Sequence, residues 1–251
     1  ILGKGGWVMR ILVLQHAAFE HAGILHNFMQ ESGISFDVVA LDEGAKIPLL
    51  DPYDALVVLG GPMGPLDSNY YPWLAEETAI IREAVVERAL PTLGICLGHQ
   101  LLALALGGSL SKMNESEVGI VEITLNEAGK HDPLFAGFAG DAIGLQWHEW
   151  QVAEPPPGAV PLAASALCPI QAMRAAPRAW GLQFHIEVHS STTEEWLAPA
   201  GHEEELQILL GPRARSIFEA QVAEHMSRLN AEARLLFNNF IQIARLPAEA
   251  V

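Results

Sequence analysis

The stretch PTLGICLGHQLLALAL, residues 91–106, decides the fold and carries the first chemical signal. Its beginning, Pro91 to Ile95, is a short apolar run that predicts a buried strand. The part from Leu97 to Leu106 predicts a helix that ends at a pair of glycines. Cys96 therefore lies at a tight turn between a strand and a helix, which is the setting of a nucleophile elbow.

Two glycines flank Cys96 in this turn. Gly94 and Gly98 let the backbone pass closely through a strained conformation that projects the thiol into a cleft at the end of the strand. The positive end of the following helix favours the thiolate, which is the nucleophilic form. A lone cysteine is more often a buried packing residue, and we interpret Cys168 in that way. For Cys96 the flanking glycines favour a nucleophile.

A second motif, GLQFHIE at residues 181–187, supplies a base. His185 and Glu187 lie two residues apart just after a predicted strand, so an extended backbone puts both side chains on one side. Glu187 can then orient the imidazole while its other nitrogen faces Cys96. With 10 histidines and 30 acidic residues, this spacing alone is weak. Together with the elbow it predicts a catalytic triad of Cys96, His185 and Glu187.

A third motif, LGGPMG at residues 59–64, is a glycine-rich turn after a predicted strand. An oxyanion formed on a substrate carbonyl needs N–H donors, and we predict those of Gly61 and Leu97. Alone, the segment is equally typical of an ordinary turn between a strand and a helix. A phosphate-binding loop is not indicated, because G-x-x-x-x-G-K-[ST] is absent.

Strands and helices alternate through the first half of the chain. This pattern predicts a parallel sheet with helices on both faces. The predicted strands besides Pro91 to Ile95 are Arg10 to Gln15, Phe36 to Leu41 and Ala55 to Leu59, and the predicted helices besides Leu97 to Leu106 are Ala22 to Glu31 and Trp73 to Arg88.

The second half predicts strands without long helices between them, hence a mixed sheet. These strands are Val118 to Leu125, Asp141 to Gln146, Ile170 to Arg174 and Trp180 to Phe184, with a surface loop at Pro155 to Pro157. At the end, apolar residues from Ile217 to Ile241 fall on one face of a helix. We therefore predict an α/β fold with a mixed, mostly parallel sheet and a long C-terminal helix.

Composition limits the class of protein and its partners. The 251 residues have a formal charge of −16, which argues against nucleic acid as a partner. The two cysteines form no C-x-x-C pair, and we find neither a membrane-spanning run nor a signal peptide. We expect a soluble cytoplasmic protein with one domain over residues 9–251, and a glycine-containing extension over residues 1–8.

Taken together, the motifs from Arg10 to Glu195 resemble the class I, triad-type glutamine amidotransferases, especially stand-alone proteins similar to the glutaminase domain of GMP synthase. The resemblance rests on the GGPM turn, the GICLGHQ elbow, the helix ending in GG, Glu117-Val118-Gly119 and QFHIE. It implies a flavodoxin-like three-layer fold and a reaction without a cofactor.

The resemblance also implies a mechanism and site residues. Cys96 would attack the carboxamide of glutamine and form a γ-glutamyl thioester, while His185 passes a proton to the leaving ammonia. Water activated by His185 would then release glutamate. Gly61 and Leu97 would hold the oxyanion, and Gln100 and Glu117 would bind the substrate.

Some residues depart from the family pattern or invite a second interpretation. Ile186 stands where the family often has proline. We interpret the run Ser190 to Thr193 as a helix N-cap, and Trp147 and Trp150 as core or rim aromatics; a role for them in substrate specificity is the alternative. For His99, beside the nucleophile, we favour structural support over catalysis.

No metal site is predicted from the sequence. His148 and Glu149 are adjacent, so their side chains point to opposite faces of a strand. His16, His21 and His26 lack a nearby carboxylate cluster in the sequence, and we interpret them as surface or hydrogen-bonded histidines.

Three functions stay open at this stage. The first is hydrolysis of glutamine, with ammonia released or passed to a separate synthetase subunit, since S-G-G-x-D-S is absent from this chain. The second is a γ-glutamyl peptidase or hydrolase that acts on γ-glutamyl amines or peptides. The third is a catalytically silent regulatory subunit on the same fold.

Overall fold

The computed structural model describes residues 8–247, so all of the predicted extension except Val8 lies outside the described residues. Its strands are β1 (Arg10–Gln15), β2 (Ser35–Ala40), β3 (Ala55–Val58), β4 (Thr92–Ile95), β5 (Ser109–Leu125), β6 (Ala142–Glu154), β7 (Val160–Ala164), β8 (Ala172–Ala176) and β9 (Ala179–Leu182). They form one mixed sheet in the order β2-β1-β3-β4-β9-β8-β7-β5-β6. The strands β2, β1, β3, β4 and β9 are parallel, and the remaining pairs are antiparallel. This confirms the predicted flavodoxin-like α/β fold.

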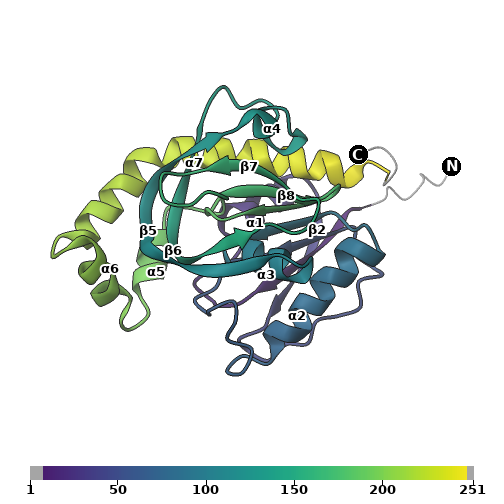
Figure 1. Cartoon of the computed structure of the whole chain (residues 1–251), viewed down its shortest axis with the longest axis horizontal. Helices are drawn as coiled ribbons and strands as arrows, with labels where there is room; N and C mark the ends of the chain where they lie inside the picture. Colours follow the sequence, from purple (N-terminus) through teal and green to yellow (C-terminus); the bar gives the residue numbers. More distant parts are fainter. Residues whose placement is uncertain (1–7, 248–251) are drawn as a thin grey trace.

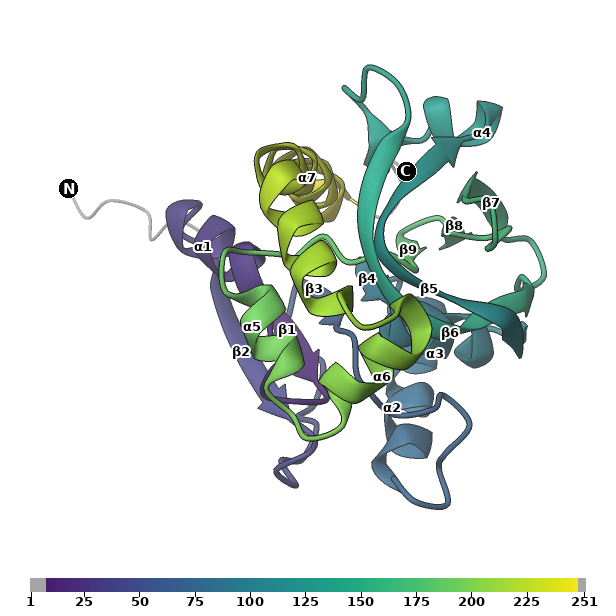
Figure 2. The same cartoon turned by 90° about the vertical axis from the view of Figure 1, so that its left-hand side faces the viewer.

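Helices cover both faces of the parallel strands (Figures 1 and 2). They are α1 (Gly23–Glu31), α2 (Trp73–Arg82), α3 (Leu97–Ala105), α4 (Glu127–Lys130), α5 (Thr192–Leu197), α6 (His202–Leu210) and α7 (Ala214–Arg245). In β1, Ile11 and Val13 pack in the cluster that contains the buried faces of α1 and α7, whereas Leu12 and Leu14 pack with α2 and α3. Successive strand side chains point to opposite faces, so a strand buried on both sides must be apolar throughout.

The antiparallel half is larger than predicted. β5 and β6 extend well beyond the predicted strands and form a long curved ribbon (Figure 2). Both alternate between buried and exposed residues over much of their length, which hides them from a search for apolar runs. β7 was not predicted, since it contains Pro161, and the pairing register shifts next to that residue. The loop at Pro155 to Pro157 is confirmed.

The long C-terminal helix is confirmed as α7, with 32 residues. The predicted helix Trp73 to Arg88 is divided: α2 ends at Arg82 and a π-helical turn follows over Glu83–Glu87. The run at Ser190 to Thr193 does begin a helix, α5, but the Ser191 side chain makes no capping bond. Instead, Oγ1 of Thr192 accepts a hydrogen bond from the N–H of His189. The short elements α4, α6 and a 3₁₀ turn at Pro133–Phe135 were not predicted.

The carboxyl ends of β1, β3, β4 and β9 meet at one edge of the parallel half. Ligands of open α/β sheets bind outside this edge. No helix of residues 8–247 is long and apolar enough to cross a bilayer.

Candidate active site

Cys96 has the strained backbone of a nucleophile elbow. Its φ of +50° and ψ of −104° lie in a region that costs a side chain about 1–3 kcal/mol. The flanking glycines are needed for space, because a Cβ on Gly94 would lie 2.4 Å from the Gly98 carbonyl oxygen. A Cβ on Gly98 would lie 2.2 Å from the carbonyl oxygen of Val58. The turn thus holds Cys96 against the wall of a cavity that it lines.

The structure brings His185 and Glu187 together beside Cys96. Nδ1 of His185 and Oε1 of Glu187 are 2.5 Å apart. The second Glu187 oxygen accepts from the N–H of Ile186 at 2.9 Å, a bond that proline at this position would lack. The backbone N–H of His185 donates to the carbonyl of Leu145, which ties the motif to β6. All three side chains, those of Cys96, His185 and Glu187, are nearly buried.

The charge of His185 follows from its neighbours. Burial alone would lower the pKa of His185, but attraction to Glu187 and Cys96, with hydrogen bonds to both, raises that pKa well above the usual value. A raised pKa keeps the ring protonated at neutral pH. A protonated imidazole beside a thiol stabilises the thiolate.

Two glutamines continue this hydrogen-bonded group. The Gln183 side-chain N–H₂ donates to Sγ of Cys96 at 3.6 Å, and its oxygen accepts from Gln100 at 3.1 Å. Gln100 also donates to the carbonyl of Trp150 and lines the cavity, as its predicted substrate role requires. The contact of Gln183 was missed, although its spacing from His185 places both side chains on the same side of an extended chain.

The predicted oxyanion loop is held by a buried ion pair. His16 Nδ1 lies 2.8 Å from the carbonyl oxygen of Gly60, and its Nε2 lies 2.8 Å from a carboxylate oxygen of Glu77. Burial opposes the charge on His16, but Glu77 and the Gly60 carbonyl raise the pKa of His16. The Gly60 carbonyl and the Gly61 N–H belong to one trans peptide and point in opposite directions. His16 therefore fixes the direction of the Gly61 N–H.

Gly61 lines the cavity, and Leu97 begins α3 directly after Cys96. Within residues 8–247, neither N–H donates a hydrogen bond in a loop or cap. The Leu97 side chain packs against Gly61, since a Cβ added there would lie 2.9 Å from Leu97 Cδ2. Both predicted donors are thus available beside the sulfur.

Glu117, in contrast, does not line the cavity. Its carboxylate accepts hydrogen bonds from Ser165, Gln171 and His148. Burial opposes its ionisation, but the hydrogen bonds from His148 and Ser165 hold the pKa of Glu117 below its usual value. His148 also faces the carbonyl of Trp150 at 2.9 Å, so only a doubly protonated ring can donate to both partners. Glu117 thus contacts the cavity through His148, which lines it.

The cavity has a volume of about 320 Å³. Trp147 and Trp150 line it, which favours the alternative interpretation of these residues. Phe19, Trp196 and His202 add further rings, and Trp196 stacks edge-on against His185 with 4.6 Å between ring centroids. The sequence signal for these wall residues is weak because they come from short loops and helices.

Two other residues with reactive side chains are buried away from this chemistry. Burial raises the pKa of Cys168 to about 12, which leaves it a neutral thiol, in keeping with its interpretation as a packing residue. Burial and the nearby charge of His148 lower the pKa of His99 to about 3. His99 is fully buried beneath α3 and packs against Gly181, which suits structural support.

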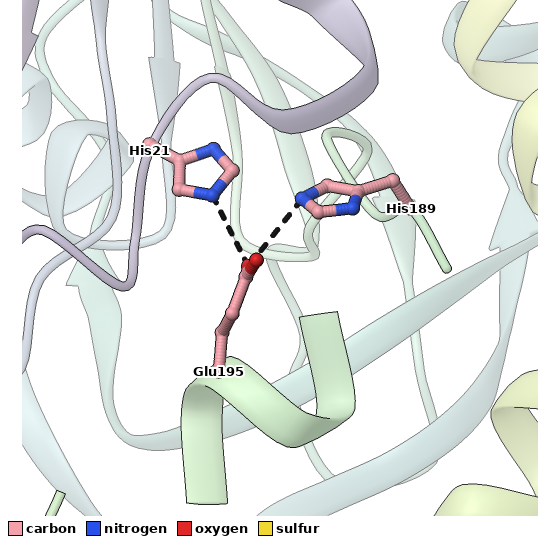
Figure 3. A group of neighbouring side chains, drawn as sticks. All are labelled: His21, His189 and Glu195. Atoms are coloured by element: carbon pink, nitrogen blue, oxygen red, sulfur yellow. Dashed lines mark hydrogen bonds and ion pairs between the residues drawn. The ribbon is translucent and has the colours of Figure 1, made fainter. Parts of the chain in front are cut away.

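The prediction that His21 has no carboxylate neighbour is wrong. His21 and His189 both face Glu195, at 3.1 and 3.4 Å from one oxygen (Figure 3). Metal-binding histidines usually donate their other ring N–H. Here the other nitrogens, Nδ1, accept from the N–H groups of Gly23 and Ser191. The nitrogens facing Glu195 then carry protons, and the group is a hydrogen-bonded brace between α5 and the loop after β1.

Comparison with known proteins agrees with this geometry. The family model described as glutamine amidotransferase class-I matches residues 19–200. The glutamine amidotransferase-like protein YfeJ of Salmonella typhimurium is 34% identical over 188 residues, which cover 71% of this chain and 76% of that protein. The separate glutamine-hydrolyzing subunit of GMP synthase from Methanosarcina barkeri is 30% identical over 192 residues, covering 75% and 93%. Full-length GMP synthases are longer, and the chain spans 34% of the one from Pyrobaculum aerophilum.

Among solved structures, a glutamine amidotransferase from Thermotoga maritima superposes with a TM-score of 0.84 at 28% identity. The match covers 94% of this chain and all of that one. The chain therefore belongs to the class I glutamine amidotransferase family.

Proposed function

We propose that this protein hydrolyses the side-chain amide of glutamine or a related γ-glutamyl amide through a thioester on Cys96. One observation carries the proposal. A nearly buried chain of contacts runs from Glu187 through His185 to Cys96 at the wall of a ligand-sized cavity. Such a nucleophile, base and orienting carboxylate are the parts that amide cleavage requires.

In the first half-reaction the Cys96 thiolate attacks the amide carbon. A C–S bond forms and the carbonyl electrons move to oxygen, where the N–H groups of Gly61 and Leu97 hold the oxyanion. When the carbonyl reforms, the C–N bond breaks and His185 gives its proton to the departing nitrogen. Ammonia or an amine leaves, and the γ-glutamyl group remains on sulfur.

In the second half-reaction water attacks the thioester. His185, now neutral, takes a proton from the water, and the thiolate leaves as glutamate forms. Glu187 keeps the imidazole in the required tautomer and orientation throughout. Gln183 stabilises the thiolate between the two steps through its N–H₂ contact. Gln100, fixed by two hydrogen bonds of its N–H₂ group, is left with its oxygen to hold the amino acid end of the substrate.

Glu117 has a less direct role in this proposal. It orients His148 in the cavity wall and does not touch the substrate. A separate synthetase partner for the released ammonia is supported by the relatives that are named as glutamine-hydrolyzing subunits of GMP synthase. Without such a partner, the same chemistry is that of a γ-glutamyl hydrolase.

The test is reaction with an electrophilic glutamine analogue, followed by peptide mass spectrometry. We expect the label on Cys96, because the Cys168 thiol is neutral and lies outside the cavity lining. Glutamate release from glutamine and γ-glutamyl amides is measured in parallel. Label found mainly on Cys168, or glutamate release that survives in Cys96→Ala, would reject the proposal. Absence of both label and release would favour a silent subunit.

A further inference from the structure

A carboxylate lies beside the imidazole of His185. A Cβ on Gly60 would be 2.3 Å from Oε2 of Glu20 and 2.7 Å from Cε1 of His185, so the absence of a side chain there brings the two groups together. Glu20 lines the cavity, and its carboxylate makes no hydrogen bond or ion pair with residues 8–247. Burial raises the pKa of the Glu20 carboxyl, although the charge of His185 acts in the opposite direction.

An aromatic wall extends from the same side of His185. The ring of Trp196 contacts His185, and that of Trp147 lies 6.3 Å from Trp196 and 5.8 Å from His202. Phe19 packs edge-on against His202 at 5.3 Å. Aromatic faces attract cations through their negative quadrupole.

The wall ends at a second carboxylate. Oε1 of Glu205, an exposed residue of α6, accepts a long hydrogen bond of 3.4 Å from the indole of Trp147. Glu149 also lines the cavity, but it is paired with Lys112 at 2.8 Å. Among the described residues, no lysine or arginine lines the cavity. This compartment therefore has excess negative charge in a protein whose formal charge is −16.

The side of the cavity next to His185 receives the leaving group. In the proposed reaction His185 protonates the departing nitrogen, so this nitrogen must lie at the ring. Any substituent on it extends past Glu20 or along the aromatic wall. Glutamine itself, whose leaving group is ammonia, would leave this compartment unfilled.

Resting on the proposed amide hydrolysis, we propose that the preferred substrate is a γ-glutamyl amide of a cationic amine, such as a diamine. Its free ammonium group binds among Glu20, Glu205 and the rings of Trp147 and Trp196. The reaction balances as for glutamine: the γ-carbon–nitrogen bond breaks, His185 protonates the nitrogen, and the diamine leaves before water hydrolyses the Cys96 thioester. A γ-glutamyl amide of an amino acid would instead place a carboxylate against two carboxylates.

The test compares three amides of similar length. They are the γ-glutamyl amides of 1,4-diaminobutane (cationic), pentylamine (neutral) and 4-aminobutanoate (anionic), with glutamine as reference. Glutamate release is followed in the wild-type protein. We expect kcat/KM for the cationic amide to exceed that for the neutral amide about 10-fold and the anionic amide about 100-fold, as one buried charge contact permits.

The variants Glu20→Gln and Glu205→Gln test the assigned contacts, and Glu43→Gln, at an exposed residue of a distant loop, is the matched control. We expect either cavity variant to reduce the cationic-to-neutral ratio several-fold and the control to preserve it. Glu205 is exposed, so its variant serves even where Glu20→Gln fails to fold.

The outcomes are distinguishable. Glutamate release at similar kcat/KM for all three amides would overturn this inference and leave the proposed hydrolysis standing. A Glu20→Gln variant that slows every substrate equally would also overturn it, since Glu20 would then bind the shared glutamyl part. No release from any amide or from glutamine, with no adduct on Cys96, would reject the proposed hydrolysis itself.

Discussion

The parallel and antiparallel halves of the sheet contribute different parts of the active site. The parallel half, with β4 and β9, carries the proposed reacting groups at strand ends, where the backbone fixes them: Cys96 at a strained turn and His185 just beyond β9. The antiparallel ribbon, with α5 and α6, contributes Trp147, Trp196 and Glu205, which line the cavity. The comparison teaches that one half determines the chemistry and the other determines which substrate reaches it.

The largest expected effect comes from the parallel half. Cys96→Ala removes the nucleophile, and we expect glutamate release to fall about 10⁴-fold or more, as in other triads that lose a member. Cys168→Ala is the matched control and is expected to keep its activity. The measurement is steady-state glutamate release by both variants. Equal losses in the two variants would remove the distinction between the sites.

The second prediction concerns the orienting carboxylate. Glu187→Gln leaves the shape of the site but removes the charge that raises the pKa of His185, so we expect kcat to fall about 10²- to 10⁴-fold. Glu194→Gln, at an exposed residue of α5, is the control and should match the wild type. Kinetics for both variants check this, and a Glu187→Gln enzyme with full kcat would contradict the role of Glu187.

The third prediction concerns the loop held by His16. Glu77→Gln removes the charge that stabilises protonated His16, which loosens the hold on the Gly60–Gly61 peptide. We expect kcat to fall about 10-fold with KM nearly unchanged, because the oxyanion exists only during reaction. Its exposed neighbour provides the control Glu76→Gln. If KM rises while kcat stays, the pair serves ground-state binding instead.

The fourth and smallest effect is on stability. Burial lowers the pKa of His99 to about 3, so the unfolded chain binds this proton more readily than the folded protein. His99 therefore costs stability as the pH falls from about 6.5 toward 3. Between pH 7 and 4.5 we expect His99→Gln to lose about 2 kcal/mol less free energy of unfolding than the wild type. Urea unfolding at both pH values, with exposed His26→Gln as control, checks this.

The same contrast explains what the sequence could predict. Continuous apolar runs and the GICLGHQ turn identify the parallel half, because strands buried on both faces leave a strong signal. Burial of one face weakens that signal in β5 and β6, and Pro161 conceals β7. His185 and Glu187 are adjacent in a motif.

Other contacts are invisible in sequence. His16 and Glu77, or His21 and Glu195, are brought together only by the fold. The same is true of the cavity wall, whose members come from separate elements. Glu117 shows the converse: a motif identified it, but three hydrogen-bond donors hold it behind His148.

The most direct test of the central claim is to trap the intermediate. The protein is mixed with glutamine or a γ-glutamyl amide, quenched in acid within the first turnover, and digested for peptide mass mapping. We predict a γ-glutamyl mass increment on the peptide that contains Cys96, accumulating most in a variant slowed at the water step. A wild-type enzyme that turns over substrate while Cys96 stays unmodified at every quench time would contradict the account.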